Sequence, residues 1–119
     1  HASGKKILAE CGGMLYLMES LIDLAGQKTD MVGLLPGQGI MRERGGCQGM
    51  QYAPLPEGEF RGHAHHRSRC EHKLEPIAFG RRISHPAPGE PIYQTGNLTA
   101  SYLHLYFPSD PQALASLLR

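Results

Sequence analysis

Cys11 stands where a strand-like pattern meets a helical one, and this junction constrains the fold more than any other feature of the chain. Residues 7–17 read Ile-Leu-Ala-Glu-Cys-Gly-Gly-Met-Leu-Tyr-Leu, which places the small residues Ala9 and Gly13 two positions away from Cys11 on either side. A sharp strand-to-helix turn holds its central residue in a strained conformation that bulky neighbours would obstruct. The pattern predicts a tight turn with a thiol at its apex.

This position also predicts the chemistry of Cys11. Free N–H groups and the helix dipole at the start of a helix favour the thiolate over the thiol. The alternative is an unreactive cysteine packed between a core strand and a core helix. The small residues at the elbow spacing favour a nucleophile.

The rest of the chain predicts an α/β unit. We expect a strand over 5–10, a helix over 12–25 that ends at Gly26, and a tight hairpin turn at Gly96-Asn97. The final residues, with an N-cap candidate before Pro111, predict a helix over 112–118. Between these elements, Pro36-Gly37, 54–58 and 86–89 are predicted turns, and β-like runs cover 31–35, 47–55, 59–72, 76–81, 91–94 and 97–107.

Composition limits the class of protein. A chain of 119 residues, 40% of them hydrophobic, can bury one core, and a net charge of +1 argues against general nucleic-acid binding. Three cysteines without a CxxC pair indicate reduced thiols in a cytoplasmic protein, and no apolar stretch is long enough to span a membrane. The chain opens on His1 and reaches its nucleophile strand within ten residues, so we expect it to be part of a longer protein.

His104 is the candidate base for this thiol. It ends the apolar run 100–104, just before a proline-containing turn, and α/β folds assemble their sites at strand ends. A nucleophile on an early strand and a base on a late one can meet across a sheet. The alternative is a histidine packed in the core.

Four segments together resemble one family. Residues 9–17, 33–37, 61–69 and 99–104 resemble, in this order, the C-terminal glutamine amidotransferase domain of cobyrinic acid a,c-diamide synthase. The resemblance implies the C-terminal portion of a flavodoxin-like, class I glutamine amidotransferase fold. It also implies that Cys11 attacks glutamine, that His104 is the base, and that the N–H of Gly12 helps to hold the oxyanion.

The same resemblance implies a larger context. In the family, ammonia passes to an N-terminal synthetase domain that uses ATP and Mg²⁺ to amidate the a and c acetate side chains of a corrinoid in cobalamin biosynthesis. No cofactor is expected in the domain described by residues 1–119, and no GxxxxGK[ST] loop occurs in it. The family's upstream glycine-rich strand, which supplies a second oxyanion donor, is also not among these residues, so we expect the chain alone to be inactive.

The chain departs from the family pattern at two places. Residues 62–68 read Gly-His-Ala-His-His-Arg-Ser where the family commonly has Gly-His-Glu-Phe-His-Tyr-Ser. Tyr106 stands two residues after His104, where many related amidotransferases place a glutamate that orients the base. A Cys–His dyad, or a third group from elsewhere, must then suffice.

The segment 61–82 is rich in histidine and basic residues and has three interpretations. His63 and His65 point to one face of a strand and could chelate a metal, with Cys70 and His72 as further ligands. Alternatively, a cationic patch faces the polycarboxylate substrate or the synthetase domain, or the strand is simply solvated. For substrate or domain contacts the candidates are His63, Arg67 and Arg69, and no metal site is predicted.

Two rival functions stay open, a non-catalytic interaction module on the same scaffold and an amidotransferase for another tetrapyrrole or large acid. Because the strand over 5–10 should have an unpaired edge, we also expect the chain to form a homodimer.

Overall fold

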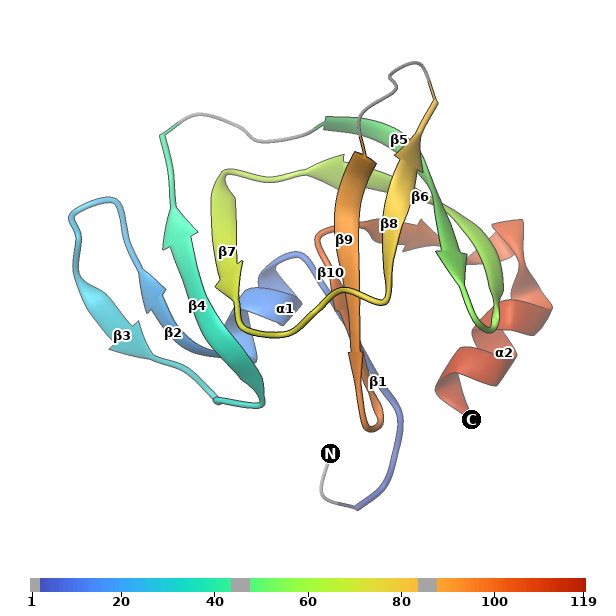
Figure 1. Cartoon of the computed structure of the whole chain (residues 1–119), viewed down its shortest axis with the longest axis horizontal. Helices are drawn as coiled ribbons and strands as arrows, with labels where there is room; N and C mark the ends of the chain where they lie inside the picture. Colours follow the sequence, from blue (N-terminus) through green and yellow to red (C-terminus); the bar gives the residue numbers. More distant parts are fainter. Residues whose placement is uncertain (1–2, 44–47, 84–87) are drawn as a thin grey trace.

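The computed structural model describes residues 3–43, 48–83 and 88–119, which form two β-sheets side by side with α1 between them (Figure 1). The seven-stranded sheet has the order β1 (Ile7–Glu10), β10 (Leu98–Ser101), β9 (Pro88–Thr95), β8 (Ala78–Arg82), β5 (Gln48–Leu55), β6 (Gly58–His65) and β11 (His104–Tyr106). The four-stranded sheet has the order β3 (Lys28–Asp30), β2 (Met18–Ile22), β4 (Leu35–Met41) and β7 (Ser68–His72). The helical segments are α1 (Gly12–Tyr16), the 3₁₀ turn η1 (Phe107–Ser109) and α2 (Pro111–Leu118).

Both sheets are mixed. Among the described pairs, β1 runs parallel to β10 and β2 runs parallel to β4, and the other pairs are antiparallel. In the β1–β10 pair Glu10 lies opposite Ser101, so the residues that follow these two strands meet at the same end of the sheet. The predicted hairpin is confirmed, because Thr95 pairs with Leu98 across Gly96-Asn97.

Two apolar clusters form the core. One lies between α1, the strands β10 and β9, and the four-stranded sheet, and includes Met14, Met18 and Leu35. The other lies between α2 and the seven-stranded sheet, where Phe60 and Leu103 are fully buried. The predicted C-terminal helix is confirmed, since Asp110 caps α2 by accepting the N–H of Ala113 at 3.0 Å.

The helix predicted over 12–25 is wrong, because α1 ends at Tyr16 and β2 follows. The carbonyls of Tyr16 and Leu17 accept hydrogen bonds from the N–H groups of Val32 and Leu35 instead of from residues four positions ahead. Asp23 then turns the chain by accepting the N–H groups of Ala25 and Gln27, both at 2.9 Å. The apolar spacing of this segment favours a helix, but long-range strand pairing overrides it and buries the polar Ser20 beside Met18.

The strand predicted over 31–35 and the turn predicted at Pro36-Gly37 are also wrong, because β4 begins at Leu35 and continues through both turn residues. Gly37 has φ 131°, and a Cβ there would collide with the backbone carbonyl of Glu71 on β7. Here glycine allows two strands to approach closely, a use that its sequence pattern does not distinguish from a turn.

The run predicted over 59–72 is two strands in two sheets. β6 ends at His65 and β7 begins at Ser68, so the chain passes from one sheet to the other at His66. Of the described helices, none is long and apolar enough to cross a membrane.

Candidate active site

Cys11 occupies the predicted turn in a strained conformation. It is the one non-glycine residue with positive φ in the described part of the chain, at φ 50° and ψ −111°. Its N–H donates to the carbonyl of Ser101 at 2.9 Å, and its own carbonyl accepts the N–H of Leu15 at 3.2 Å. These bonds tie the turn to the end of β10 and to α1, so the surrounding structure maintains the strain.

The two small residues around Cys11 have different environments. Ala9 is 5% exposed in the core, so a larger residue would have to displace packed neighbours. A Cβ at Gly12 or Gly13, in contrast, would meet nothing within 4 Å. We expected a glycine at position 13 because a larger residue would clash there. Among the described residues, no atom lies close enough for such a clash.

The surroundings of the thiol favour its neutral form. Burial raises the pKa of Cys11, the negative charges of Glu90 and Glu10 add to this rise, and the N–H of Gly12 opposes it. The N–H of Gly12 at the helix start does lower the pKa of the thiol, as predicted, but burial outweighs it. Cys11 therefore needs a base to remove its proton.

His104 lies at the same end of the seven-stranded sheet as Cys11. It opens β11, is exposed, and stands directly opposite His63 of β6. The next residue, Leu105, donates its N–H to Glu10 at 2.5 Å, so the segment after the base is joined to the residue before the nucleophile. The thiol itself donates to the carbonyl of His65 at 4.0 Å and not to the imidazole of His104.

The three predicted contact residues do not form one cluster. His63 is exposed beside His104, and Arg67 is exposed at the passage from β6 to β7. Arg69 lines a cavity on β7 and forms an ion pair of 3.5 Å with Glu71. In the residues that the structure describes, no group of three or more His, Cys, Asp or Glu side chains is placed to hold a metal ion.

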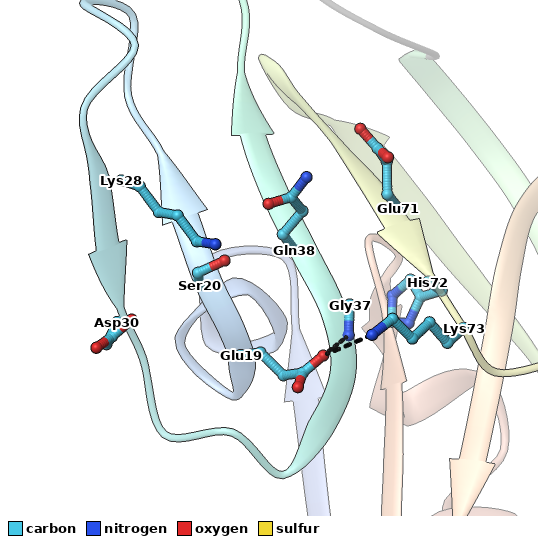
Figure 2. Close-up of a pocket in the computed structure, with 9 residues that line it drawn as sticks. All are labelled: Glu19, Ser20, Lys28, Asp30, Gly37, Gln38, Glu71, His72 and Lys73. Carbon is cyan, nitrogen blue, oxygen red and sulfur yellow. Dashed lines mark hydrogen bonds and ion pairs between the residues drawn. The ribbon is translucent and has the colours of Figure 1, made fainter.

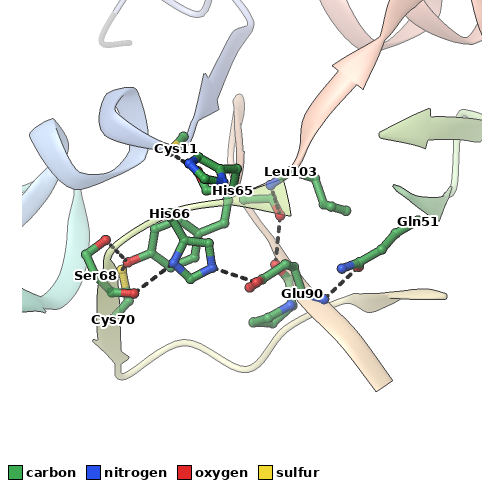
Figure 3. A network of polar contacts seen from close by, with 11 residues as sticks. Cys11, Gln51, His65, His66, Ser68, Cys70, Glu90 and Leu103 are labelled. Atoms are coloured by element: carbon green, nitrogen blue, oxygen red, sulfur yellow. Dashed lines mark hydrogen bonds and ion pairs between the residues drawn. The ribbon is translucent and has the colours of Figure 1, made fainter. Parts of the chain in front are cut away.

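Beside Cys11 lies a buried polar network that the sequence did not reveal (Figure 3). His66 Nε2 is 2.6 Å from Glu90 Oε1, its Nδ1 is 2.8 Å from the carbonyl of Ser68, and its ring stacks on Tyr102 at 3.7 Å. A carbonyl only accepts, so Nδ1 carries a proton, and the 2.6 Å contact needs a second proton between Nε2 and Glu90. The ring of His66 is therefore bonded at both nitrogens and fixed before any ligand arrives.

The network forms one wall of a cavity of about 270 Å³, lined also by Arg69, His72 and Tyr93. His72 stacks on Tyr93 at 3.7 Å, and both of its ring nitrogens are buried without a hydrogen-bond partner. Burial lowers the pKa of His72 to about 4, so its imidazole is neutral at pH 7. The cavity thus offers buried polar groups close to the nucleophile.

A larger hollow, of about 670 Å³, lies over the four-stranded sheet (Figure 2). Glu19 accepts the N–H of Gly37 at 2.7 Å and lies 3.7 Å from the ammonium of Lys73. The other charged residues that line this hollow carry both signs: Lys28, Asp30 and Glu71. Neither hollow is lined by Cys11, Gly12 or His104, but the smaller one includes Glu90, whose charge acts on the thiol of Cys11.

A strained cysteine at a strand–helix turn, with a histidine at the start of a short strand joined to it by Glu10, is an arrangement found in enzymes that use a cysteine nucleophile. Residues 1–112 match the CobB/CobQ-like glutamine amidotransferase domain, and the chain belongs to this family. The resemblance stated from the four segments is thereby confirmed, as is the class I amidotransferase-type fold.

Similar proteins carry more specific names. The chain is 50% identical over its whole length to the hydrogenobyrinate a,c-diamide synthase of Stutzerimonas stutzeri and 46% identical over 99% of its length to that of Pseudomonas aeruginosa. It is 45% identical over 98% of its length to the cobyrinate a,c-diamide synthase of Herminiimonas arsenicoxydans. The chain spans only 28%, 27% and 27% of these relatives.

Proposed function

We propose that this chain is the glutamine-hydrolysing part of an a,c-diamide synthase of cobalamin biosynthesis. The observation that carries the proposal is the strained conformation of Cys11 in a chain that matches a glutamine amidotransferase domain over residues 1–112. The ammonia would serve a synthetase domain that holds ATP and Mg²⁺ and amidates the a and c acetate groups of the corrinoid. The relatives' names supply the two acids to assay, hydrogenobyrinate and cobyrinate.

The proposed reaction begins with proton transfer from Cys11 to His104. The thiolate then attacks the carboxamide carbon of glutamine, and the N–H of Gly12 donates to the oxyanion of the tetrahedral intermediate. When the intermediate collapses, the C–N bond breaks and His104 returns the proton to the departing ammonia. Water then hydrolyses the glutamyl thioester and regenerates the thiol.

The cavity beside the nucleophile is the proposed site for the amino-acid end of glutamine. Arg69 supplies a positive charge for a carboxylate, while Glu90 and the neutral imidazole of His72 supply acceptors for an ammonium group. Glu90 and His72 are already held in place by His66 and Tyr93, which reduces the entropy lost on binding, whereas the exposed Arg69 would be ordered by the ligand.

Replacing Cys11 tests the proposal in the complete polypeptide that contains this chain. Cys11→Ser and Cys11→Ala should abolish glutamine-dependent amidation and leave ammonia-dependent amidation nearly intact, because the synthetase chemistry is separate. Both activities are measured by formation of the a,c-diamide. If both are lost, Cys11 has a structural role.

One observation favours the alternative of a non-catalytic module. The thiol is half-buried, has a raised pKa and donates to a backbone carbonyl, as a structural cysteine does. In that case the complete wild-type polypeptide would show ammonia-dependent amidation but no glutamine-dependent amidation for Cys11→Ala to remove.

For the chain of 119 residues itself, we propose a two-fold dimer and no glutaminase activity. In the part of the chain that the structure describes, β1 is first in the strand order of its sheet and pairs only with β10, so a second copy can cover its other edge. Losing one oxyanion donor costs about 10²–10³ in rate. Light scattering that shows a stable monomer at high concentration would contradict the dimer, and turnover at the rate of a complete synthase would contradict the inactivity.

A further inference from the structure

Glu10, the residue before Cys11, joins the two outermost strands of the seven-stranded sheet. β1 is first in the strand order and β11 is last. Even so, Oε2 of Glu10 accepts a hydrogen bond of 2.5 Å from the N–H of Leu105, across 95 positions of sequence. The sheet therefore curves until one side chain of its first strand reaches the backbone of its last.

The two joined residues flank the two candidate catalytic residues. Glu10 directly precedes Cys11, and Leu105 directly follows His104. β11 is only three residues long, and β6 is its one neighbour in the described sheet. So short a strand with one neighbour is weakly fixed, and the charge-assisted bond on its other side holds His104 at a set place relative to Cys11.

We propose that Glu10 is a positioning residue that fixes His104 relative to Cys11 by holding the backbone of β11. The inference rests on the proposed function, because this spacing matters only if His104 takes the proton of Cys11. Two residues after His104, where many related amidotransferases have a glutamate that orients the base, this chain has Tyr106. In the proposal, the carboxylate of Glu10 orients His104 instead, through the backbone.

The charge of Glu10 has the opposite effect on the nucleophile. It is one of the causes that raise the pKa of Cys11, so Glu10 does not activate the thiol directly. Its benefit must come from the hydrogen bond, which a neutral amide oxygen can also accept. Glu10→Gln therefore keeps the position and removes the charge, whereas Glu10→Ala removes both.

The test compares these variants in the complete polypeptide. Glu10→Ala should lower kcat for glutamine hydrolysis about 100-fold and leave KM for glutamine within about twofold, because a displacement of about 1 Å costs that much rate without removing a binding contact. Glu10→Gln should keep most of kcat. In the Glu10→Gln variant, the pH at which iodoacetamide alkylates Cys11 should also be lower than in the wild type.

Glu19→Ala is the matched control. Glu19 accepts the N–H of Gly37 at 2.7 Å, which is a bond of the same kind in the other sheet. This variant should keep kcat, and thermal unfolding should show that each variant is folded. If Glu10→Ala does not fold, Glu10→Asp replaces it, because the carboxylate is kept and its reach is one methylene shorter, so kcat should fall about tenfold.

Three results would overturn the inference. Glu10→Ala could turn over glutamine as fast as Glu19→Ala, or Glu10→Asp could keep full kcat where the alanine variant does not fold. Glu10→Gln could also lose as much kcat as Glu10→Ala, which would assign the effect to charge. These results leave the proposed function standing, whereas a wild-type protein that hydrolyses no glutamine would overturn both.

Discussion

The two hollows of this molecule hold their charged groups in opposite ways. Beside Cys11, the side chains of His66 and Glu90 are 6% and 8% exposed and 2.6 Å apart. Over the four-stranded sheet, those of Lys73 and Glu19 are 74% and 50% exposed and 3.7 Å apart. The first pair is fixed by its surroundings, whereas in the second Glu19 is held by the N–H of Gly37 and the ammonium of Lys73 is solvated.

This difference explains why the smaller hollow is the better candidate for chemistry. Groups that are already oriented need no rearrangement when charge develops during a reaction, and in a dry site they act more strongly than in water. The larger hollow exceeds the smaller by about 400 Å³ (670 − 270) but offers no such fixed groups near a nucleophile. In this protein the volume of a hollow is therefore a poor guide to its function.

The largest expected effect comes from breaking the buried pair. Glu90→Ala should lower the free energy of unfolding by about 3–5 kcal/mol, because His66 would keep a buried ring nitrogen without its partner. Lys73→Ala, which breaks the exposed pair, should cost at most about 1 kcal/mol. Urea unfolding of the chain measures both.

Equal losses from the two variants would break the comparison between the hollows. They would mean that water reaches the His66–Glu90 pair in solution. A loss of only a few tenths of a kcal/mol for Glu90→Ala would have the same meaning, since exposed pairs contribute that much.

Local signals predicted several elements of the fold correctly. The hairpin at Gly96-Asn97 and the helix after Asp110 follow from turn and cap residues that act within a few positions. β2 was not predictable in this way, because Met18, Leu21 and Ile22 follow a helical period, whereas the buried face of the strand includes the polar Ser20. Its partner β4 begins 17 residues after β2 does (35 − 18), and this pairing decides its conformation.

In the candidate site, too, the features set by neighbouring residues were predicted and those set by long-range contacts were not. The turn at Cys11 was predicted from the small residues two positions on either side, although in the structure only Ala9 is closely packed. The pairing of His66 with Glu90 was missed, because no spacing rule connects residues 24 positions apart on different strands. The direction of the pKa shift of Cys11 was wrong because it depends mainly on burial, which residue order does not show.

His72 lies against both hollows and gives the smallest expected effect. Burial lowers its pKa to about 4 from an ordinary value near 6.5, so below pH 6.5 the unfolded chain binds more protons than the folded one. This difference in proton binding makes the free energy of unfolding depend on pH. The contribution of the neutral His72 is fully present above about pH 6.5 and is lost as the pH falls towards about 4. Partial exposure of the ring limits the loss to about 1–2 kcal/mol.

His72→Phe keeps an aromatic ring over Tyr93 and removes the two unpaired nitrogens. The variant should gain about 1 kcal/mol at neutral pH, because no buried polar group is then left unsatisfied. It should also lose less stability than the wild type when urea unfolding is repeated near pH 5. His63→Phe, which makes the same substitution at an exposed histidine, is the matched control. If wild type and His72→Phe lose stability equally on acidification, the ring of His72 has a partner in solution and the cavity is wet.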